Sequence, residues 1–391
     1  MKKFLLIIIF LCIPFLSGCW DKTELQDLGI ITAAAIDQVE EGKTMVSVQL
    51  FIPRAIRSGE TGEDPSTVFT FVREGVGDNL ADAVSKLQFN VPRKLFWQHC
   101  KIYIFGEELA KNGIRDEIDF LARSPNPRGN SYFFVSEGKA AELLKVVPPL
   151  ERYSGEALRK LVDYEESRAT TLRNIDMGFM SEGESVTMPL VKKLISREPA
   201  RESFQTIPII SGTGIFKKDR LVGTLTIEES RGLMWLKDNV TMSTVSVKPE
   251  GVEGDVVLTP TLGRVKFSPE IKGDRWIYHV MINIKGDIIQ NETKLNLMNL
   301  DTLIQIQNGY QQVLKGRVMR AAELLQKKYK TDAFNMGKRF HHKYPKEWKK
   351  VQDHWDEKFQ EVEIIVNVEA KIRKPGFVGP PAALPKDEVK K

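Results

Sequence analysis

The amino-acid sequence predicts an α+β protein, with mixed, largely antiparallel sheets and packed helices in two or three domains. Segments rich in β-forming residues alternate with amphipathic segments, but without the strict strand–helix–strand repeat of parallel α/β folds. One stretch near residues 303–329 has apolar residues at every third or fourth position, which is typical of a long amphipathic helix. About 370 residues follow the N-terminal leader, enough for two or three domains of about 100–200 residues each.

The first half of the chain is predicted to hold strands with interspersed helices. Residues 28–37 and 44–53 are rich in β-formers and are separated by a glycine-containing turn, a pattern typical of a hairpin. Residues 67–74 predict a third strand, and residues 78–89 predict a helix for which Asp78 is the candidate N-cap. The next predicted elements are a buried strand at 101–105, helical turns at 107–113 and 114–124, a strand at 130–138, helices at 139–147 and 151–167, and a loop at 174–185.

The second half has a different pattern. A charged segment at residues 195–203, which contains Pro199, separates the two halves, and we place a domain boundary between residues 198 and 199. The predicted elements beyond this boundary are strands at 207–216 and 221–227, a short helix at 228–238 and alternating runs between residues 245 and 289. The alternating runs suit a curved antiparallel sheet with one face buried.

The longest predicted element is the amphipathic helix near residues 303–329. Its apolar face consists of Leu303, Ile306, Tyr310, Leu314, Val318, Ala321 and Leu325. A helix of this length extends about 40 Å, and we expect its apolar face to lie against a sheet. Residues 344–359 predict a second helix with Pro345 in its first turn, residues 362–373 predict a closing strand, and the Pro-rich tail 376–391 is predicted to be disordered.

The chain begins with a lipoprotein-like leader. Lys2 and Lys3 precede an apolar run at residues 4–16, which is too short to cross a hydrocarbon core that needs about 20 apolar residues. The tetrad Leu16-Ser17-Gly18-Cys19 looks like a bacterial lipobox, in which the cysteine thiol takes a diacylglyceryl group and becomes the first mature residue. Two or more acyl chains hold a protein stably on a membrane, where one does not. The simpler alternative is a plain signal peptide with a chance cysteine.

Charge and cysteine content narrow the class of protein. The net charge is +5, and removal of Lys2 and Lys3 leaves 5 − 2 = +3 on the mature chain, which does not suggest a nucleic-acid binder. Cys12 leaves with the leader and Cys19 would carry lipid, so Cys100 has no partner for an intramolecular disulfide.

Basic residues are concentrated in two segments near the C-terminus. Residues 327–350 contain nine Lys and Arg residues against Asp332 and Glu347, and residues 371–391 contain six against Asp387 and Glu388. Such a basic segment could lie on anionic lipid. A solvated helix face followed by a frayed chain end is the more frequent explanation.

Two motifs look like fragments of chemical sites but are better explained by packing. The pair His99–Cys100 could suggest a nucleophile and its base, but neighbours on a strand point to opposite faces, so we expect a structural cysteine. The run Gly212-Thr213-Gly214 resembles the start of a phosphate loop, yet it lacks a third glycine and a following helix. A bulge or a tightly packed strand is expected there.

The basic C-terminal segment contains histidines and tryptophans, two residue types that can bind ligands. His341, His342 and His354 could form a metal site, but their spacing fits no zinc pattern and surface positions are favoured. Trp348 and Trp355 lie seven residues apart and are expected to be core residues rather than ligand-stacking ones.

Two glutamate pairs and a methionine-containing stretch are the remaining candidate functional residues. The pairs Glu165–Glu166 and Glu228–Glu229 diverge if they lie on helices, so solvated faces are expected. Met177, Phe179 and Met180 lie in the predicted loop and could form an exposed contact for a partner. No catalytic, cofactor-binding or metal-binding residue is therefore predicted, and the chain is interpreted as a non-enzymatic protein that presents surfaces.

Several long stretches resemble one known family, the Ger(x)C spore germination proteins, which are the lipoprotein C subunits of nutrient germinant receptors. The resemblance begins at "GCWDKTELQDLGIITAAAIDQ" and returns at "RKLFWQHCKIYIFGEELAKNGIRDEIDFLARSPNPR" and "GTGIFKKDRLVGTLTIEESRGLMWLK". It ends with "DAFNMGKRFHHKYPKEWKKVQDHWDEKFQEVEIIVNVEAKIR", so that together these stretches span nearly the whole chain.

The resemblance implies a location, partners and a domain division. It implies a lipid-anchored protein on the outer face of the spore inner membrane, in a complex with the receptor's membrane-embedded A and B subunits. It implies no cofactor and no catalytic residue, and its only residue with a chemical role is the lipobox cysteine, here Cys19. The expected division is a signal peptide at 1–18, an N-terminal domain of one or two subdomains at 19–198, a C-terminal domain at 199–375 and the tail.

The sequence is consistent with three alternative functions. The first is the non-catalytic receptor subunit, required for receptor assembly and the germination response. The second is a lipoprotein solute-binding receptor that itself captures a small nutrient, which would need a deep cleft with convergent polar groups. The third is a cell-wall or cortex hydrolase, which would need two carboxylates or a metal in one cleft.

Overall fold

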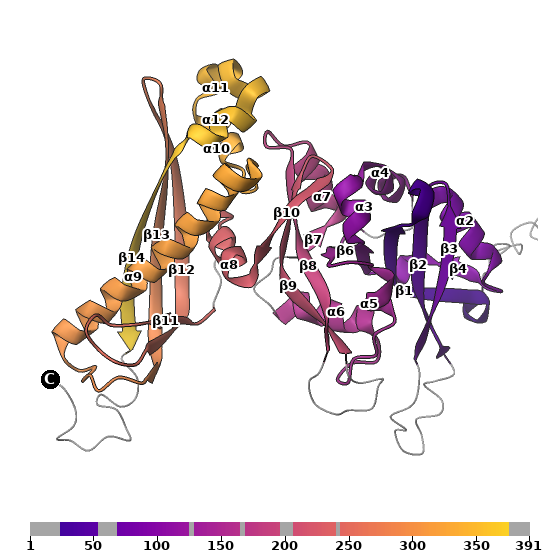
Figure 1. The fold of residues 1–391 in the computed structure, drawn as a ribbon, viewed down its shortest axis with the longest axis horizontal. Helices are drawn as coiled ribbons and strands as arrows, with labels where there is room; N and C mark the ends of the chain where they lie inside the picture. Colours follow the sequence, from indigo (N-terminus) through magenta and orange to yellow (C-terminus); the bar gives the residue numbers. More distant parts are fainter. Residues whose placement is uncertain are drawn as a thin grey trace, which may run out of the picture.

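The chain forms two sheets that lie side by side along the long axis of the molecule (Figure 1). The computed structural model describes residues 24–53, 69–124, 129–164, 169–195, 206–239 and 243–374. The lipobox, the Glu165–Glu166 pair and the Pro-rich tail lie outside these described residues, so those interpretations stay predictions. The mixed α+β class that the sequence predicted is confirmed.

The N-terminal sheet is mixed and has ten strands. Along its main path the order is β10-β9-β8-β6-β5-β1-β2-β3, while β4 pairs with β1 and β7 pairs with β6. The strands are β1 (Leu28–Gln38), β2 (Thr44–Phe51), β3 (Thr70–Gly77), β4 (Lys94–Phe96), β5 (Ile102–Phe105), β6 (Tyr132–Ser136), β7 (Thr170–Thr171), β8 (Ser185–Ile195), β9 (Thr206–Lys217) and β10 (Arg220–Thr226). The central pairs β1–β5, β5–β6 and β6–β8 are parallel, whereas both outer parts of the path are antiparallel hairpins.

Helices cover both faces of this sheet, which explains the near-continuous apolar strands at its centre. In β1, Ala34 and Ile36 join one core cluster, while Ala33 and Ala35 join the cluster on the opposite face. The helices are α2 (Leu80–Phe89), α3 (Glu107–Asn112), α4 (Arg115–Arg123), α5 (Ala141–Leu144), α6 (Ser154–Tyr164) and α7 (Leu172–Phe179). Short 3-10 turns occupy Leu25–Asp27, Glu40–Gly42 and Trp97–His99.

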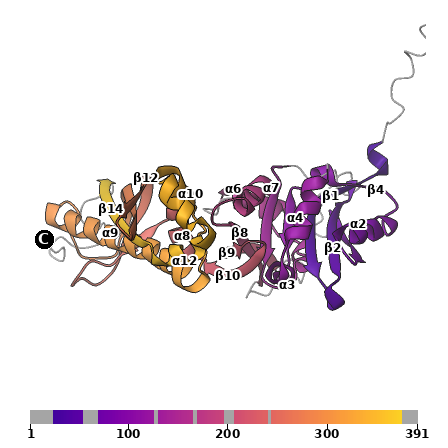
Figure 2. The ribbon, with the colours of Figure 1, turned by 90° about the horizontal axis from the view of Figure 1, so that it is seen from above.

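The C-terminal sheet has four strands in the order β11-β12-β13-β14. They are β11 (Val245–Val247), β12 (Val256–Lys272), β13 (Arg275–Asn291) and β14 (Glu363–Lys374). The first three pair antiparallel, as the alternating sequence predicted, but β14 pairs parallel to β13. The C-terminal half has five helices among the described residues. They are α8 (Ile227–Leu236), α9 (Leu300–Glu323), α10 (Met336–Lys343), α11 (Pro345–Val351) and α12 (Trp355–Glu361). A π-helical turn occupies Leu324–Tyr329 and a 3-10 turn occupies Gln352–His354. Both views place α8 between the two sheets (Figures 1 and 2).

The long predicted helix is confirmed as α9 and its π-helical extension. Asn299 caps its first turn, since the Asn299 side chain accepts a hydrogen bond from the Asp301 N–H at 2.8 Å. Six of the seven residues of the predicted apolar face are buried in the core shared with β11–β14, and Leu303 is partly buried against it. The helix therefore packs on one face of the C-terminal sheet, as its periodicity predicted.

Three local predictions were wrong. The loop predicted at residues 174–185 begins as helix α7, because Thr171 and Asn174 form a capping box and Ile175 is buried. The N-cap of α2 is Asn79 rather than Asp78, since the Asn79 side chain accepts from the Asp82 N–H at 3.0 Å. The single helix predicted at 344–359 is divided into α11 and α12 by a 3-10 turn.

The predicted domain boundary between residues 198 and 199 lies between two paired strands. β8 and β9 pair antiparallel from Ser185↔Lys217 to Ile195↔Thr206, and β10 continues the same sheet. The N-terminal sheet therefore includes residues up to Thr226, the last residue of β10. Helix α8 follows and precedes the first strand of the second sheet. The boundary at 198 stays a prediction about how the chain divides into independent units.

Candidate functional site at the junction of the two sheets

The segment between the π-helical turn and α10 is organised around a buried carboxylate, that of Asp332. Its Oδ1 accepts a hydrogen bond from the Met336 N–H at 2.9 Å. Its Oδ2 accepts from the Gly337 N–H at 2.7 Å and from the Trp355 Nε1–H at 3.2 Å. Burial raises the pKa of Asp332 in spite of these hydrogen bonds, which act in the opposite direction. The carboxylate thus caps α10 and joins it to α12.

Two tryptophans pack around this carboxylate. Trp348 and Trp355 are both 2 % exposed and their ring centroids lie 4.9 Å apart. A Cβ added at Gly337 would lie 2.8–2.9 Å from both indoles, so only glycine fits there without displacement. The prediction that these tryptophans are core residues is confirmed.

The same segment touches the N-terminal sheet directly. The Ser185 Oγ–H donates to the main-chain oxygen of Asp332 at 2.5 Å. A Cβ added at Gly183 would lie 2.8 Å from that oxygen, so the two backbones are in close approach. The Lys217 ammonium donates to the Lys330 carbonyl at 3.2 Å and pairs with Asp356 at 2.6 Å. Hydrogen bonds, close backbone packing and an ion pair therefore join the two halves.

Tyr329 forms a second direct connection between the halves. It ends the π-helical turn, is 8 % exposed, and its O–H donates to the Thr224 carbonyl in β10 at 2.6 Å. Its ring lies flat on Gly223, where an added Cβ would be only 2.0 Å from the ring carbon Cε1. A side chain larger than hydrogen at position 223 is therefore incompatible with this position of the ring.

The histidines of the basic segment lie on the surface around this junction. His341, His342 and His354 are exposed, and His341 Nδ1 lies 2.8 Å from Glu182 Oε1 in the N-terminal half. The His341 ring also stacks on Trp348, with centroids 5.6 Å apart. Within the described ranges, no group of three or more His, Cys, Asp or Glu side chains is placed to hold a metal ion.

A cavity of about 550 Å³ opens between the two halves, next to these contacts. The N-terminal half contributes α7, the loop after it and the start of β8, while the C-terminal half contributes the end of α8 and the start of α10. Met177 and Met180, which the sequence marked as candidate contact residues, line the cavity with side chains that are 50 % and 80 % exposed. Phe179, the third of that group, packs partly buried against the N-terminal core instead.

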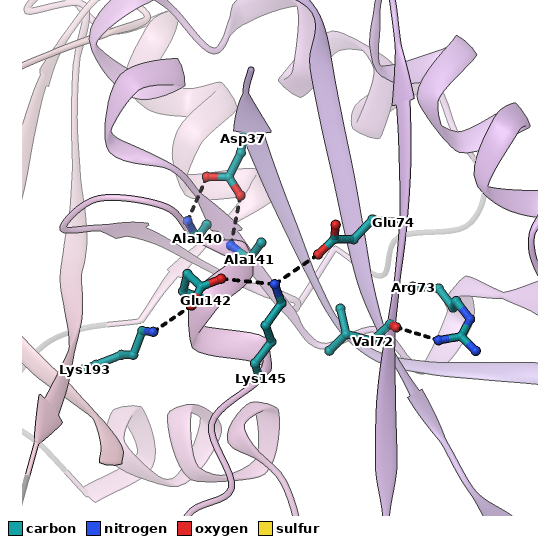
Figure 3. Close-up of polar contacts among 9 residues, drawn as sticks. All are labelled: Asp37, Val72, Arg73, Glu74, Ala140, Ala141, Glu142, Lys145 and Lys193. Carbon is teal, nitrogen blue, oxygen red and sulfur yellow. Dashed lines mark hydrogen bonds and ion pairs between the residues drawn. The ribbon is translucent and has the colours of Figure 1, made fainter. Parts of the chain in front are cut away.

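A second buried aspartate organises the N-terminal half. Asp37 is the penultimate residue of β1 and is 2 % exposed, and its two carboxylate oxygens accept from the Ala140 N–H at 2.7 Å and the Ala141 N–H at 2.9 Å (Figure 3). Burial raises the pKa of Asp37, although the two backbone hydrogen bonds oppose that shift. An added Cβ at Gly106 would lie 2.0 Å from the carboxylate, so the site is tightly enclosed.

A chain of ion pairs runs across the sheet beside Asp37. Lys145 lies between Glu74, at 3.4 Å, and Glu142, at 3.0 Å, and Glu142 also pairs with Lys193 at 2.9 Å (Figure 3). These groups come from β3, the end of α5 and β8, and all are partly exposed. Partly exposed pairs of this kind contribute little stability individually.

Cys100 is a buried structural residue. It is fully buried, its Sγ–H donates weakly to the Ile102 carbonyl at 3.4 Å, and burial raises the pKa of its thiol to about 12. His99 is exposed and lies in a 3-10 turn rather than on a strand, but it still does not reach the thiol as a base would. The prediction of a structural cysteine is confirmed.

Iodoacetamide is accordingly expected not to alkylate Cys100 in the folded chain. The thiolate is the reactive form, and both the raised pKa and burial suppress it. Mass spectrometry of tryptic peptides after labelling at pH 8 should find Cys100 unmodified, while the guanidinium-unfolded control is modified completely. Equal labelling of the folded and unfolded chains would contradict the buried position.

The glycine and glutamate motifs also have structural roles. An added Cβ at Gly212, whose φ is +159°, would lie 1.9 Å from the Leu225 carbonyl oxygen, and one at Gly214 would lie 2.6 Å from Val135. This confirms tight strand packing in place of a phosphate loop. Glu229 belongs to the capping box of α8 with Thr226, whereas Glu228 pairs with Arg231 on the surface.

The chain is similar to known proteins both in its fold and in its sequence. The structure is similar to the solved "Crystal Structure of the GerBC protein", with a TM-score of 0.59 and 20% identity, over 87% of this chain and 97% of that one. Residues 21–193 match the family described as "Spore germination protein N-terminal domain", and residues 211–376 match "Spore germination B3/ GerAC like, C-terminal". The two matches together cover nearly all of the chain.

The chain belongs to the Ger(x)C family of spore germination proteins, as the sequence resemblance indicated. Among its relatives, "Spore germination protein KC" of Bacillus subtilis (strain 168) is 26% identical over 96% of both chains. "Spore germination protein B3" of the same organism is 22% identical over 95% of this chain and 98% of that protein.

Proposed function

We propose that this protein is the lipid-anchored, non-catalytic C subunit of a spore nutrient germinant receptor, required for receptor assembly and the germination response. The observation that carries the proposal is the family match across both halves of the chain. Its place of action would be the outer face of the spore inner membrane, where it would join the receptor's A and B membrane subunits.

The leader supports membrane attachment through Cys19, because its apolar run at residues 4–16 is shorter than the roughly 20 residues that cross a bilayer. In the described part of the chain, no helix is both long and apolar enough to cross a bilayer. The tetrad Leu16-Ser17-Gly18-Cys19 supplies a thiol for a diacylglyceryl group directly before the polar body of the protein. Two acyl chains bury enough methylene groups, at about 0.8 kcal/mol each, for stable anchoring.

The arrangement of the two sheets supports an assembly role. The junction is held by buried or close contacts at Asp332, Ser185 and Tyr329, so the two halves present their outer surfaces in a defined relation. Some of the groups that the sequence offered for chemistry have structural roles: Cys100 is a core thiol, and Trp348 and Trp355 pack around α10. A body of this kind suits recognition by partner subunits.

The replacement Cys19→Ala tests the anchor. We expect the parent chain to show, by mass spectrometry, an N-terminal Cys19 with thioether-linked diacylglycerol and to sediment with membranes. Cys19→Ala should carry no lipid, lose its membrane fraction and weaken nutrient-triggered germination. Ser17→Ala keeps a small residue before the cysteine and serves as the matched control. Unchanged membrane sedimentation and germination in the Cys19→Ala strain would refute the proposal.

Direct capture of a small nutrient is the second candidate function. It is favoured by one observation, the cavity between the two halves, because ligand sites are typically clefts of about 300–1,000 Å³ with a few polar groups on apolar walls. Saturable binding of an amino acid or sugar by the chain without its membrane partners would support this function.

A further inference from the structure

Both halves of the chain contribute apolar residues to the lining of the cavity. Met177 and Met180 from α7 and its following turn, Val186 from β8, and Met234 and Phe334 from the other half all line it. Methionine side chains are flexible and polarisable, so they adapt to ligands of varied shape. Met177 and Met180 remain 50 % and 80 % exposed, so both are accessible to a ligand in the cavity.

The C-terminal half also contributes three cationic side chains to the cavity lining, those of Lys237, Lys338 and Arg339. Glu182 is the single acidic residue among the described lining residues. Glu182 already pairs with His341 at 2.8 Å, which offsets its charge when the histidine is protonated. Among the residues that the structure describes, Lys338 has no carboxylate partner and is exposed at the cavity mouth.

Arg339 is held in place at this wall by contacts that leave its charge unneutralised. Its guanidinium donates to the Phe334 carbonyl at 2.7 Å and lies over the Phe267 ring, 4.0 Å from the centroid. Lys237 is fixed by donation to Thr187 Oγ1 at 2.6 Å, across the junction. A neutral oxygen and a ring thus position the Arg339 guanidinium beside the cavity, where a bound anion would pair with it.

The N-terminus of α10 does not supply the anion site. The N–H groups of Met336 and Gly337, which would face a ligand there, are already bound by the Asp332 carboxylate. Any attraction for an anion must come from the side chains of Lys338 and Arg339.

We propose that this cavity binds a small organic anion with an apolar body, such as an arylalkyl carboxylate. The apolar body would lie on the Met177 and Met180 side, and the carboxylate would face Lys338 and Arg339. The ligand would contact both halves of the chain at once. Its binding would therefore stabilise the junction. The proposal rests on the second candidate function, ligand capture in this cavity, and is independent of the lipid anchor proposed at Cys19.

A matched pair of probes tests the charge and the apolar contact together. The full lipidated chain in nanodiscs is titrated with 3-phenylpropionate and with its uncharged amide, 3-phenylpropionamide, and binding is measured by saturation-transfer NMR with empty nanodiscs as the background. We expect saturable binding of the carboxylate and binding of the amide at least about fivefold weaker, as is usual for loss of one charge contact.

Variants at exposed positions locate the site without disturbing the fold. Lys338→Glu and Met180→Asp should each weaken 3-phenylpropionate binding about fivefold or more. Lys346→Glu, which changes an exposed lysine on α11 outside the cavity, should leave binding unchanged. Absence of saturable binding, equal binding of the acid and amide, or parent-like affinity in either cavity variant would overturn the proposal.

Discussion

Replacement of Asp332 by asparagine is expected to lower the free energy of unfolding by about 3 kcal/mol, although the two side chains have nearly the same shape. Each carboxylate oxygen of Asp332 accepts from at least one N–H group, and Oδ2 accepts from both Gly337 and Trp355. An amide can accept at one position only, so its NH₂ group would face buried donors in either orientation. Those donors would lose their hydrogen bonds in a site without water access, which is costly.

Chemical denaturation followed by tryptophan fluorescence measures this change, because Trp348 and Trp355 pack beside Asp332. The control is Asp353→Asn, which removes an exposed carboxylate from the neighbouring 3-10 turn and should change stability by less than about 0.5 kcal/mol. Similar, small effects of both replacements would show that the Asp332 hydrogen bonds do not hold this junction.

The free energy of unfolding of the parent chain should also depend on pH differently from that of Asp332→Asn. Burial raises the pKa of Asp332 above its usual value of 3.8. A carboxyl with a raised folded-state pKa binds its proton more tightly when folded, so its contribution to stability is complete below pH 3.8 and is lost as the pH rises through the raised pKa. Asparagine does not titrate, so the stability difference between parent and Asp332→Asn should shrink as the pH rises through that range.

Replacement of Gly223 by alanine is expected to loosen the junction by about 2 kcal/mol. The new methyl group would lie 2.0 Å from the Tyr329 ring, so the ring must move away from β10. That movement also removes the 2.6 Å hydrogen bond from the Tyr329 O–H to the Thr224 carbonyl. Thermal unfolding should show a lower midpoint for Gly223→Ala.

A double-mutant cycle isolates the cause. In a Tyr329→Ala background the ring is absent, so Gly223→Ala should cost less than about 1 kcal/mol. The control is Gly316→Ala in α9, where an added Cβ meets open space and the better helix propensity of alanine should raise stability by up to about 1 kcal/mol. An undiminished cost of Gly223→Ala in the Tyr329→Ala background would exclude the ring contact as the reason.

Local patterns in the sequence were sufficient to predict the elements with strong periodicity. The apolar face of α9 and the paired tryptophans were assigned correctly because burial on one helix face leaves a repeat of three to four residues. The α7 helix was not predicted because its sequence signals are weak. It has a capping box at Thr171 and Asn174 but only one buried side chain, Ile175, and one buried residue cannot produce a periodic apolar pattern. The two-part form of α11 and α12 was missed because the spacing of Trp348 and Trp355 fits a continuous helix.

The contents of the junction could not be predicted because they depend on residues far apart in the chain. Ser185 and Asp332 meet across 147 positions, and the cavity combines α7 with α10. A single aspartate in a basic segment gives no local sign that its carboxylate will be buried. Asp37 offered a weak sign, since it is an acidic residue near the end of an otherwise largely apolar strand, where its carboxylate accepts from the N–H groups of Ala140 and Ala141. The sequence predicted Met177 and Met180 as contact residues, but it gave no sign that Lys338 and Arg339 line the same cavity.

The position of β14 has a consequence for how the chain reaches this structure. β13 and β14 lie side by side and parallel, yet residues 292–362 separate them along the chain. Contacts between such distant segments raise the contact order and slow folding. The C-terminal sheet must wait for nearly the whole polypeptide to be synthesised before its last strand can dock, and a nascent chain that has not reached Glu363 exposes an unpaired β13 edge that is prone to aggregation.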